Sequence, residues 1–172
     1  MKKIKVGVIG CGVICNNHIV PLMENEKTEV VAVCDIVFEK AKKKADEFGC
    51  KPYADYKEMI EKENLDSVHI CLPHYLHSEV AIYALEKGLD VLCEKPMAKT
   101  YAEAKAMYEA SVRTGKKLSI GYQSRWRDDS LYLKQCCENG DLGEIYYARA
   151  LAIRRRAVPT WGVFLNEYEQ GG

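Results

Sequence analysis

Short apolar runs alternate with helix-like segments along the first two thirds of the chain, and this alternation is the strongest constraint on its fold. The runs predict strands at Ile4 to Ile9, Glu29 to Cys34, Pro52 to Ala54, Ser67 to Leu72, Asp90 to Cys93 and Lys117 to Gly121. The segments between them predict helices at Val13 to Met23, Val37 to Phe48, Tyr56 to Lys62, Ser78 to Lys87 and Tyr101 to Arg113. Strand–helix–strand units form parallel pairs. The predicted fold class is therefore α/β, with a doubly wound parallel sheet of the Rossmann type.

Residues typical of helix ends support these boundaries. Asp55 is a suitable N-cap for the helix that follows it. Thr100 with Glu103 three residues later has the pattern of a capping box. Gly49 and Gly115 stand just past two helices, where a left-handed residue commonly ends the helix.

The pattern changes after Gly121. A helix is predicted at Asp129 to Glu138, followed by a glycine-containing turn and a long strand at Glu144 to Ile153. We therefore predict a dinucleotide-binding domain over residues 1–121. Residues 122–172 are then the truncated start of an α+β C-terminal substrate and oligomerisation domain, because a single strand cannot form a stable sheet alone.

Composition excludes several classes of protein. The chain has 25 basic and 25 acidic residues, so a nucleic-acid binder that neutralises phosphates is not expected. No apolar run reaches the ~18 residues of a membrane span, and we expect a cytoplasmic protein. The eight cysteines form no pair of CxxC motifs, so we expect no metal site, and they are interpreted mainly as small buried hydrophobes.

The first predicted strand ends in a glycine motif, Gly10-Cys11-Gly12-Val13-Ile14-Cys15. In the dinucleotide fingerprint the first glycine permits a tight turn, and the second lets the backbone approach the pyrophosphate. The third position must be small, and Cys15 is small but unusual there. The helix that begins after Val13 and Ile14 could hold a diphosphate at its N-terminus.

Asp35 supplies the second half of this fingerprint. It lies 20 residues beyond Cys15, at the end of the second predicted strand. A carboxylate there accepts hydrogen bonds from the adenosine ribose hydroxyls and repels a 2′-phosphate, which favours NAD over NADP. The alternative interpretation is an ordinary glycine turn followed by an acidic helix N-cap.

Two further segments follow predicted strands at the edge where such sheets bind ligands. The first contains Leu72, Pro73, His74 and His77. Its histidines either face the cofactor or serve as solvated loop residues and helix caps. The second is the run Cys93-Glu94-Lys95-Pro96, in which the lysine either relays a substrate proton or is a surface charge.

The stretch from Ala84 to Ala98, which contains Glu94-Lys95-Pro96, resembles the signature of the glucose–fructose oxidoreductase, inositol dehydrogenase and MocA family (Gfo/Idh/MocA). The resemblance implies that Lys95 is catalytic or orients substrate, and that Glu94 and Pro96 line the cofactor site. It also implies that the Lys95–Pro96 peptide is cis. Pro73 and His77 match the family's loop after the fourth strand, whereas His74 stands where asparagine is usual.

The resemblance extends beyond the sixth predicted strand. The run Gly121-Tyr-Gln-Ser-Arg-Trp126 is similar to a family segment that leaves this strand, which implies that Gln123 contacts the cofactor and Arg125 the substrate. Trp161 falls in a family loop near the substrate. The alternative interpretation of that region is a basic edge strand with a tryptophan that packs against the fold.

The family resemblance implies an NAD-dependent dehydrogenase that transfers a hydride between nicotinamide and a sugar, cyclitol or related polyol. The family continues past a glycine-rich turn into a segment with a catalytic aspartate and histidine, so we expect this chain to bind NAD and to turn over poorly. Family members commonly oligomerise through the C-terminal sheet, which implies a homo-oligomer. Two alternatives remain, a non-catalytic NAD-binding sensor module and an NAD-assisted glycoside-cleaving enzyme.

Overall fold

The computed structural model describes residues 2–153, 155, 162–163 and 165–170. Six strands form one sheet in the order β3-β2-β1-β4-β5-β6, and every neighbouring pair is parallel. The strands are β1 (Ile4–Ile9), β2 (Thr28–Cys34), β3 (Lys51–Tyr53), β4 (Ser67–Ile70), β5 (Asp90–Cys93) and β6 (Leu118–Ile120). The chain reverses its direction of winding between β1 and β4, and this strand order confirms the predicted Rossmann-type sheet.

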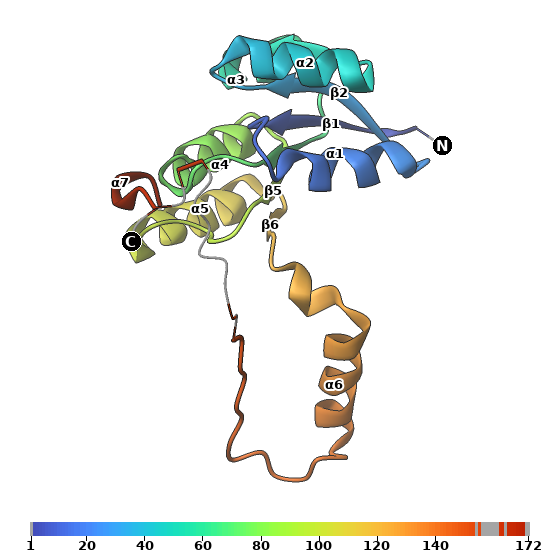
Figure 1. The fold of residues 1–172 in the computed structure, drawn as a ribbon, viewed down its shortest axis with the longest axis vertical. Coiled ribbons are helices and arrows are strands. Elements are labelled where there is room, and N and C mark those ends of the chain that lie inside the picture. Colours follow the sequence, from blue (N-terminus) through green and yellow to red (C-terminus); the bar gives the residue numbers. More distant parts are fainter. Residues whose placement is uncertain (1, 154, 156–161, 164, 171–172) are drawn as a thin grey trace.

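Helices cover both faces of this sheet (Figure 1). One apolar cluster joins the sheet to α1 (Cys15–Glu24) and α2 (Phe38–Phe48). A larger cluster on the opposite face joins it to α3 (Tyr56–Lys62), α4 (His77–Glu86) and α5 (Tyr101–Thr114). The two layers fix the sheet from both sides, so that its carboxyl edge is a rigid platform.

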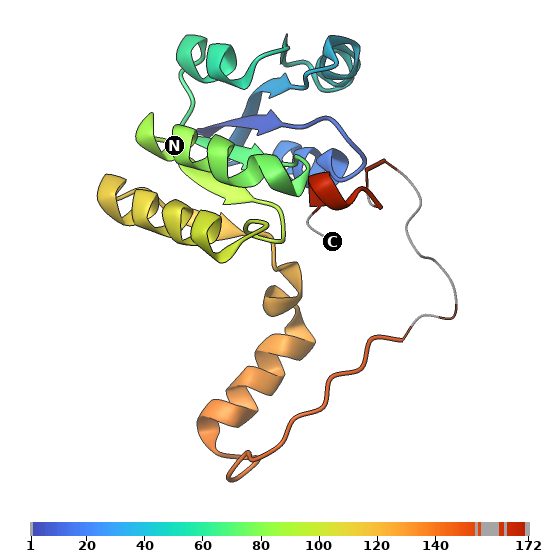
Figure 2. The same ribbon diagram turned by 90° about the vertical axis from the view of Figure 1, so that its left-hand side faces the viewer.

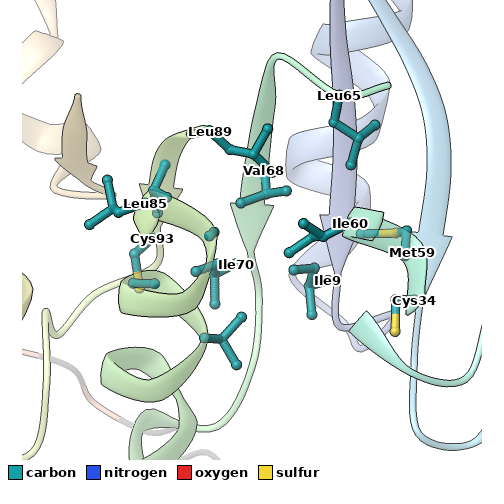
Figure 3. Packing of buried hydrophobic residues seen from close by; sticks show 14 of the residues in the cluster. Ile9, Cys34, Met59, Ile60, Leu65, Val68, Ile70, Leu85, Leu89 and Cys93 are labelled. Carbon is teal, nitrogen blue, oxygen red and sulfur yellow. The ribbon is translucent and has the colours of Figure 1, made fainter. Parts of the chain in front are cut away.

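The larger cluster explains why the sequences of the central strands are continuous apolar runs. Ile9, Val68 and Ile70 on neighbouring strands meet Met59 of α3 and Leu85 of α4 (Figure 3). Each of these side chains is at most 2% exposed. Strands that are buried on both faces need apolar residues at successive positions, which matches the pattern in the sequence.

The predicted helix ends are confirmed where the sequence carried a capping signal. The Asp55 carboxylate accepts a hydrogen bond from Lys57 N at 2.8 Å. At the start of α5, Thr100 Oγ1 accepts from Glu103 N at 3.2 Å, and the Glu103 carboxylate accepts from Thr100 N at 2.9 Å. Gly115 ends α5 with φ of +67°, a left-handed conformation that glycine adopts without strain.

The region beyond β6 differs from the sheet domain. A short 3₁₀ turn, η2 (Gln123–Trp126), leads into α6 (Asp128–Asn139), which extends away from the sheet (Figures 1 and 2). No described residue from 122 to 170 is buried. None of the described helices is long and apolar enough to cross a membrane.

The strand predicted over Glu144 to Ile153 is wrong, because these residues are irregular in the structure. Their alternating sequence is suited to a strand, but a strand also needs a neighbour whose backbone completes its hydrogen bonds. No described segment pairs with residues 144–153. Further along, α7 (Glu167–Gln170) lies against the 3₁₀ turn η1 (His74–Leu76), where the rings of Tyr168 and Tyr75 are 5.5 Å apart.

Candidate functional site

The loop between β1 and α1 is built around Gly10, which has a φ of +99°. A Cβ atom at Gly10 would lie 2.4 Å from the carbonyl oxygen of Cys71, in the loop after β4. Only glycine therefore fits between the two strand ends. By contrast, a Cβ at Gly12 would have no heavy atom within 4 Å, so the space beside Gly12 is open to a ligand.

Two backbone N–H groups in this loop are free to bind an anion. Those of Val13 and Ile14 have no hydrogen-bond acceptor among the described residues. The Val13 side chain is 79% exposed, so nothing in the described structure covers the loop at this position. Together with the N-terminus of the ten-residue helix α1, these donors and the open space at Gly12 fit a diphosphate.

Cys15 occupies the third position of the fingerprint and is fully buried beneath this loop. It packs with Val8 and Ile19 in the cluster under α1, so the small side chain allows the helix to approach the sheet. The Cys11 thiol donates to the carbonyl oxygen of Cys34 at 3.6 Å, and the neighbouring Cys15 thiol together with burial raises the pKa of Cys11. The two cysteines are therefore part of the core packing that supports the turn.

Asp35 lies at the carboxyl end of β2, beside the glycine loop. Its Oδ2 accepts a hydrogen bond from Cys11 N at 2.9 Å, and its Oδ1 accepts one from Val37 N at 2.9 Å. The carboxylate thus ties β2 to the glycine loop and is fixed in orientation. Each carboxylate oxygen has further acceptor capacity, which a ligand hydroxyl could use.

The loop after β4 places its two histidines differently. His77 is completely buried, and its ring nitrogens lie 2.8 Å from the carbonyl oxygens of Leu72 and Pro96. Burial lowers the pKa of His77, while the two carbonyl contacts oppose this shift. Its ring therefore joins the loop that carries Pro73 to the loop that carries Lys95. His74 is half-buried, and its Nδ1 lies 2.9 Å from the carbonyl oxygen of Gln170 in α7.

Glu94 takes part in a hydrogen-bonded chain that the sequence did not reveal. Its Oε1 lies 2.9 Å from Nε2 of His18 on α1, and His18 Nδ1 lies 3.1 Å from Nδ1 of His69 on β4. The other carboxylate oxygen, Oε2, accepts from Lys95 N at 3.1 Å. The hydrogen bond with His18 lowers the pKa of Glu94, so the group is held as a carboxylate.

Lys95 follows Glu94 with an exposed side chain, and the Lys95–Pro96 peptide is cis as expected. The side chain borders an open pocket of about 410 Å³ between the strand ends of β5 and β6. The pocket is lined by Lys95, Tyr122, Gln123, Ser124 and Arg125. The pocket therefore brings together Lys95, Gln123 and Arg125, which the sequence predicted as site residues from two separate motifs. Trp161 lies outside the described residues.

These features meet at one edge of the sheet. The glycine loop, Asp35, the β4 loop and the Lys95 loop all follow the carboxyl ends of their strands. In doubly wound sheets a ligand binds at this edge, where the winding direction reverses, which here lies between β1 and β4. The described residues hold no group of three or more His, Cys, Asp or Glu side chains arranged to bind a metal ion.

Comparison with known proteins places this geometry in a family. Residues 4–122 match the model of the GFO_IDH_MocA oxidoreductase family, described as an NAD-binding Rossmann fold. D-glucoside 3-dehydrogenase of Escherichia coli (strain K12) is 36% identical over 98% of this chain and 49% of its own length. Inositol 2-dehydrogenase of Salmonella typhimurium is 34% identical over 92% of this chain and 48% of its own length.

A solved structure agrees with these relatives. The WlbA dehydrogenase from Bordetella pertussis, in complex with NADH and UDP-GlcNAcA, superposes with a TM-score of 0.80. It is 31% identical, and the match covers 84% of this chain and 45% of that one. The chain thus spans about half the length of the curated relatives it matches. On this evidence the chain belongs to the Gfo/Idh/MocA family of NAD-binding oxidoreductases, whose members include glucoside and inositol dehydrogenases.

Proposed function

We propose that the chain forms the dinucleotide half of an NAD-dependent dehydrogenase that acts on a sugar, cyclitol or related polyol. The observation that carries this proposal is the joint geometry of Gly10, Gly12 and Asp35, in which an open loop adjoins a fixed carboxylate. The substrate class rests on the two relatives, which are named for a glucoside and an inositol.

The roles of the residues follow from their places at the sheet edge. The N–H groups of Val13 and Ile14 would bind the diphosphate, with Gly12 leaving room for it. Asp35 would accept hydrogen bonds from the adenosine ribose, and Leu72, Pro73 and His74 would line the cofactor further along the edge. His77 would act indirectly, by holding the loops of Pro73 and Lys95 together.

Lys95 is the proposed catalytic residue. NAD, when bound, would supply the acceptor for a hydride from the carbinol carbon. The Lys95 side chain would hydrogen-bond the reacting oxygen and relay its proton. Gln123 and Arg125 border the same pocket, where Gln123 would contact the cofactor and Arg125 the substrate. We propose that residues 1–172 alone bind NAD but turn over slowly, since the relatives are about twice as long.

Asp35 is the basis for proposing NAD over NADP. A fixed carboxylate at the ribose would repel the 2′-phosphate of NADP. The test is a fluorescence titration of the chain with NADH and with NADPH, and we expect NADH to bind more tightly. Asp35→Asn should reduce the ratio of NADH affinity to NADPH affinity by about tenfold, or about 1.4 kcal/mol.

Asp46→Asn is the matched control, because Asp46 is an exposed carboxylate on α2, away from the glycine loop. It should leave both affinities within about twofold. Equal binding of NADH and NADPH by the unaltered chain would contradict the cofactor preference. The absence of binding by either would contradict the proposed function itself.

We also propose self-association through residues 122–153. The described side chains there include exposed Leu133, Tyr146 and Ile153, of which Tyr146 is 95% exposed. Apolar side chains concentrated on one region are typical of an interaction surface. Light scattering after size exclusion should show a dimer or larger species, and a monodisperse monomer would contradict this.

We also propose a cytoplasmic location. All eight cysteines are free thiols, which supports a reducing compartment such as the cytoplasm.

A further inference from the structure

The hydrogen-bonded chain of His69, His18 and Glu94 lies beneath the proposed site. Its members come from β4, from α1 and from the loop after β5, so it joins the helix α1 to two neighbouring strands of the sheet. His18 is 9% exposed, and both of its ring nitrogens have partners. Such a satisfied polar network fixes its members in one arrangement.

The geometry of Glu94 shows what this network could control. One carboxylate oxygen contacts His18, and the other accepts the N–H of Lys95. A Cβ at Gly121 would lie 3.2 Å from Glu94 Oε1, so the start of the segment after β6 packs closely against the same carboxylate. The position of the Lys95 backbone therefore depends on a carboxylate that His18 orients.

His18 also lies on α1, within one turn of the helix N-terminus at Cys15. The same helix would bind the diphosphate, whereas Lys95 would act at the opposite, nicotinamide end of the cofactor. We propose that His18 is a positioning residue that links these two ends. By its hydrogen bond to Glu94, His18 holds the Lys95 loop in the position in which Lys95 can contact the nicotinamide half of the cofactor. This inference rests on the proposed dinucleotide function.

The protonation states of His69, His18 and Glu94 are consistent with this link. His69 is kept neutral, because burial and the nearby His18 lower its pKa to about 4. A neutral His69 has one N–H, so its Nδ1 can either accept from His18 or donate to it. When His69 donates, a neutral His18 donates from Nε2 to Glu94; when His69 accepts, His18 can donate from both nitrogens only as an imidazolium. In both arrangements the carboxylate, which only accepts, has the Nε2–H of His18 as its partner.

The test compares two probes, ADP and NADH. ADP contains the diphosphate and adenosine but no nicotinamide. In His18→Leu we expect the affinity for NADH to fall about tenfold, because the Lys95 loop is no longer held in position, and the affinity for ADP to change less than about twofold. His18→Gln should retain most NADH affinity, because its side-chain amide can donate to Glu94. Glu24→Gln, an exposed change at the opposite end of the same helix, is the control and should alter neither affinity.

A spectroscopic readout separates this link from the proposed function. In His18→Leu the ¹³Cδ resonance of Glu94 should titrate at a higher pH than in the unaltered chain, and the amide resonance of Lys95 should move. Equal losses of ADP and NADH affinity, or an unchanged Glu94 titration, would overturn the link. If the unaltered chain binds neither probe, the proposed function fails, but the Glu94 titration still decides the role of His18.

A second variant keeps the test decisive if His18→Leu does not fold. Glu94→Gln removes the charge that His18 contacts and retains an oxygen that can accept from Lys95 N. We expect the same selective loss of NADH affinity, with ADP binding retained. An unchanged NADH affinity in Glu94→Gln would contradict the proposal.

Discussion

The sheet domain and the region that follows it show two outcomes within one chain. In residues 2–121 every helix packs an apolar face against the sheet, and side chains such as Ile19 and Met107 are fully buried. In α6, Leu131 and Leu133 are exposed, at 42% and 57%. Both regions contain helices with apolar residues, so the difference lies in whether a partner surface is present.

This difference also separates what each region could contribute to function. The sheet domain positions its loops by burial, since Gly10, Asp35 and His77 are each fixed by contacts with a neighbouring strand or loop. The described part of the second region reaches the site only near its beginning, through the pocket residues Gln123 and Arg125, and near its end, through α7. We therefore expect stability and dinucleotide binding to depend on the first region.

The largest expected effect comes from replacing one leucine in each region by alanine. Leu85→Ala, at a fully buried site between α4 and the sheet, should lower the free energy of unfolding by about 3 kcal/mol, through lost burial and a cavity. Leu133→Ala on α6 should change it by less than about 0.5 kcal/mol. Urea denaturation followed by circular dichroism measures both, and similar losses would contradict the contrast between the regions.

The glycines of the first loop give the next largest effect. Gly10→Ala should destabilise the fold by about 2 to 3 kcal/mol, because it combines a positive φ with a Cβ 2.4 Å from a carbonyl oxygen. Gly12→Ala should cost less than about 1 kcal/mol, since its Cβ meets no protein atom. Thermal unfolding of the two variants tests this, and equal midpoints would show that the loop is not held against the β4 loop.

Acidification should weaken the sheet domain through His69. Its pKa is about 4 in the fold against 6.5 as the ordinary value, so between these limits the unfolded chain binds more protons and stability falls as pH falls. From pH 7 to pH 5 this one group should remove about 2 kcal/mol. His77, whose pKa is also lowered, acts with the same sign.

His69→Gln is the control for this pH dependence, because glutamine does not titrate. Urea denaturation at both pH values should show a smaller loss in this variant than in the unaltered chain. The same loss in both proteins would exclude His69 as the cause.

The smallest expected effect concerns helix ends. Thr100→Ala removes the capping box of α5 and should cost about 1 kcal/mol. In contrast, α6 begins without a side-chain cap and has no buried residue. Amide hydrogen exchange of the monomer, at low protein concentration, should therefore show strong protection in α5 and rapid exchange in α6. Comparable protection in the monomer would contradict the contrast between the regions, whereas protection of α6 that appears only at high concentration would support the proposed self-association.

Much of the sheet domain was predictable because its signals are local. The alternation of runs predicted all six strands, and Thr100 with Glu103 predicted the start of α5. Glu144 to Ile153 was predicted wrongly, because alternation shows which residues suit a strand and not whether a neighbouring strand exists.

The site was predictable only in part for a related reason. Gly10 and Asp35 belong to a motif of nearly fixed spacing, and the structure brings them together through Cys11 N. His18 and His69 carry no such signal, since His18 meets residues 51 and 76 positions further along the chain. The burial of His77 depends equally on carbonyl groups from two loops, which no local pattern specifies.

The most direct test of the central claim is an NADH titration of the chain beside its Gly12→Ala variant. The unaltered chain should bind NADH saturably with one site, and Gly12→Ala should bind at least about tenfold more weakly, because its Cβ fills the space proposed for the diphosphate. The two proteins should have nearly the same thermal midpoint. Equal NADH affinity in the two folded proteins, or no binding by the unaltered chain, would contradict a dinucleotide site at this loop.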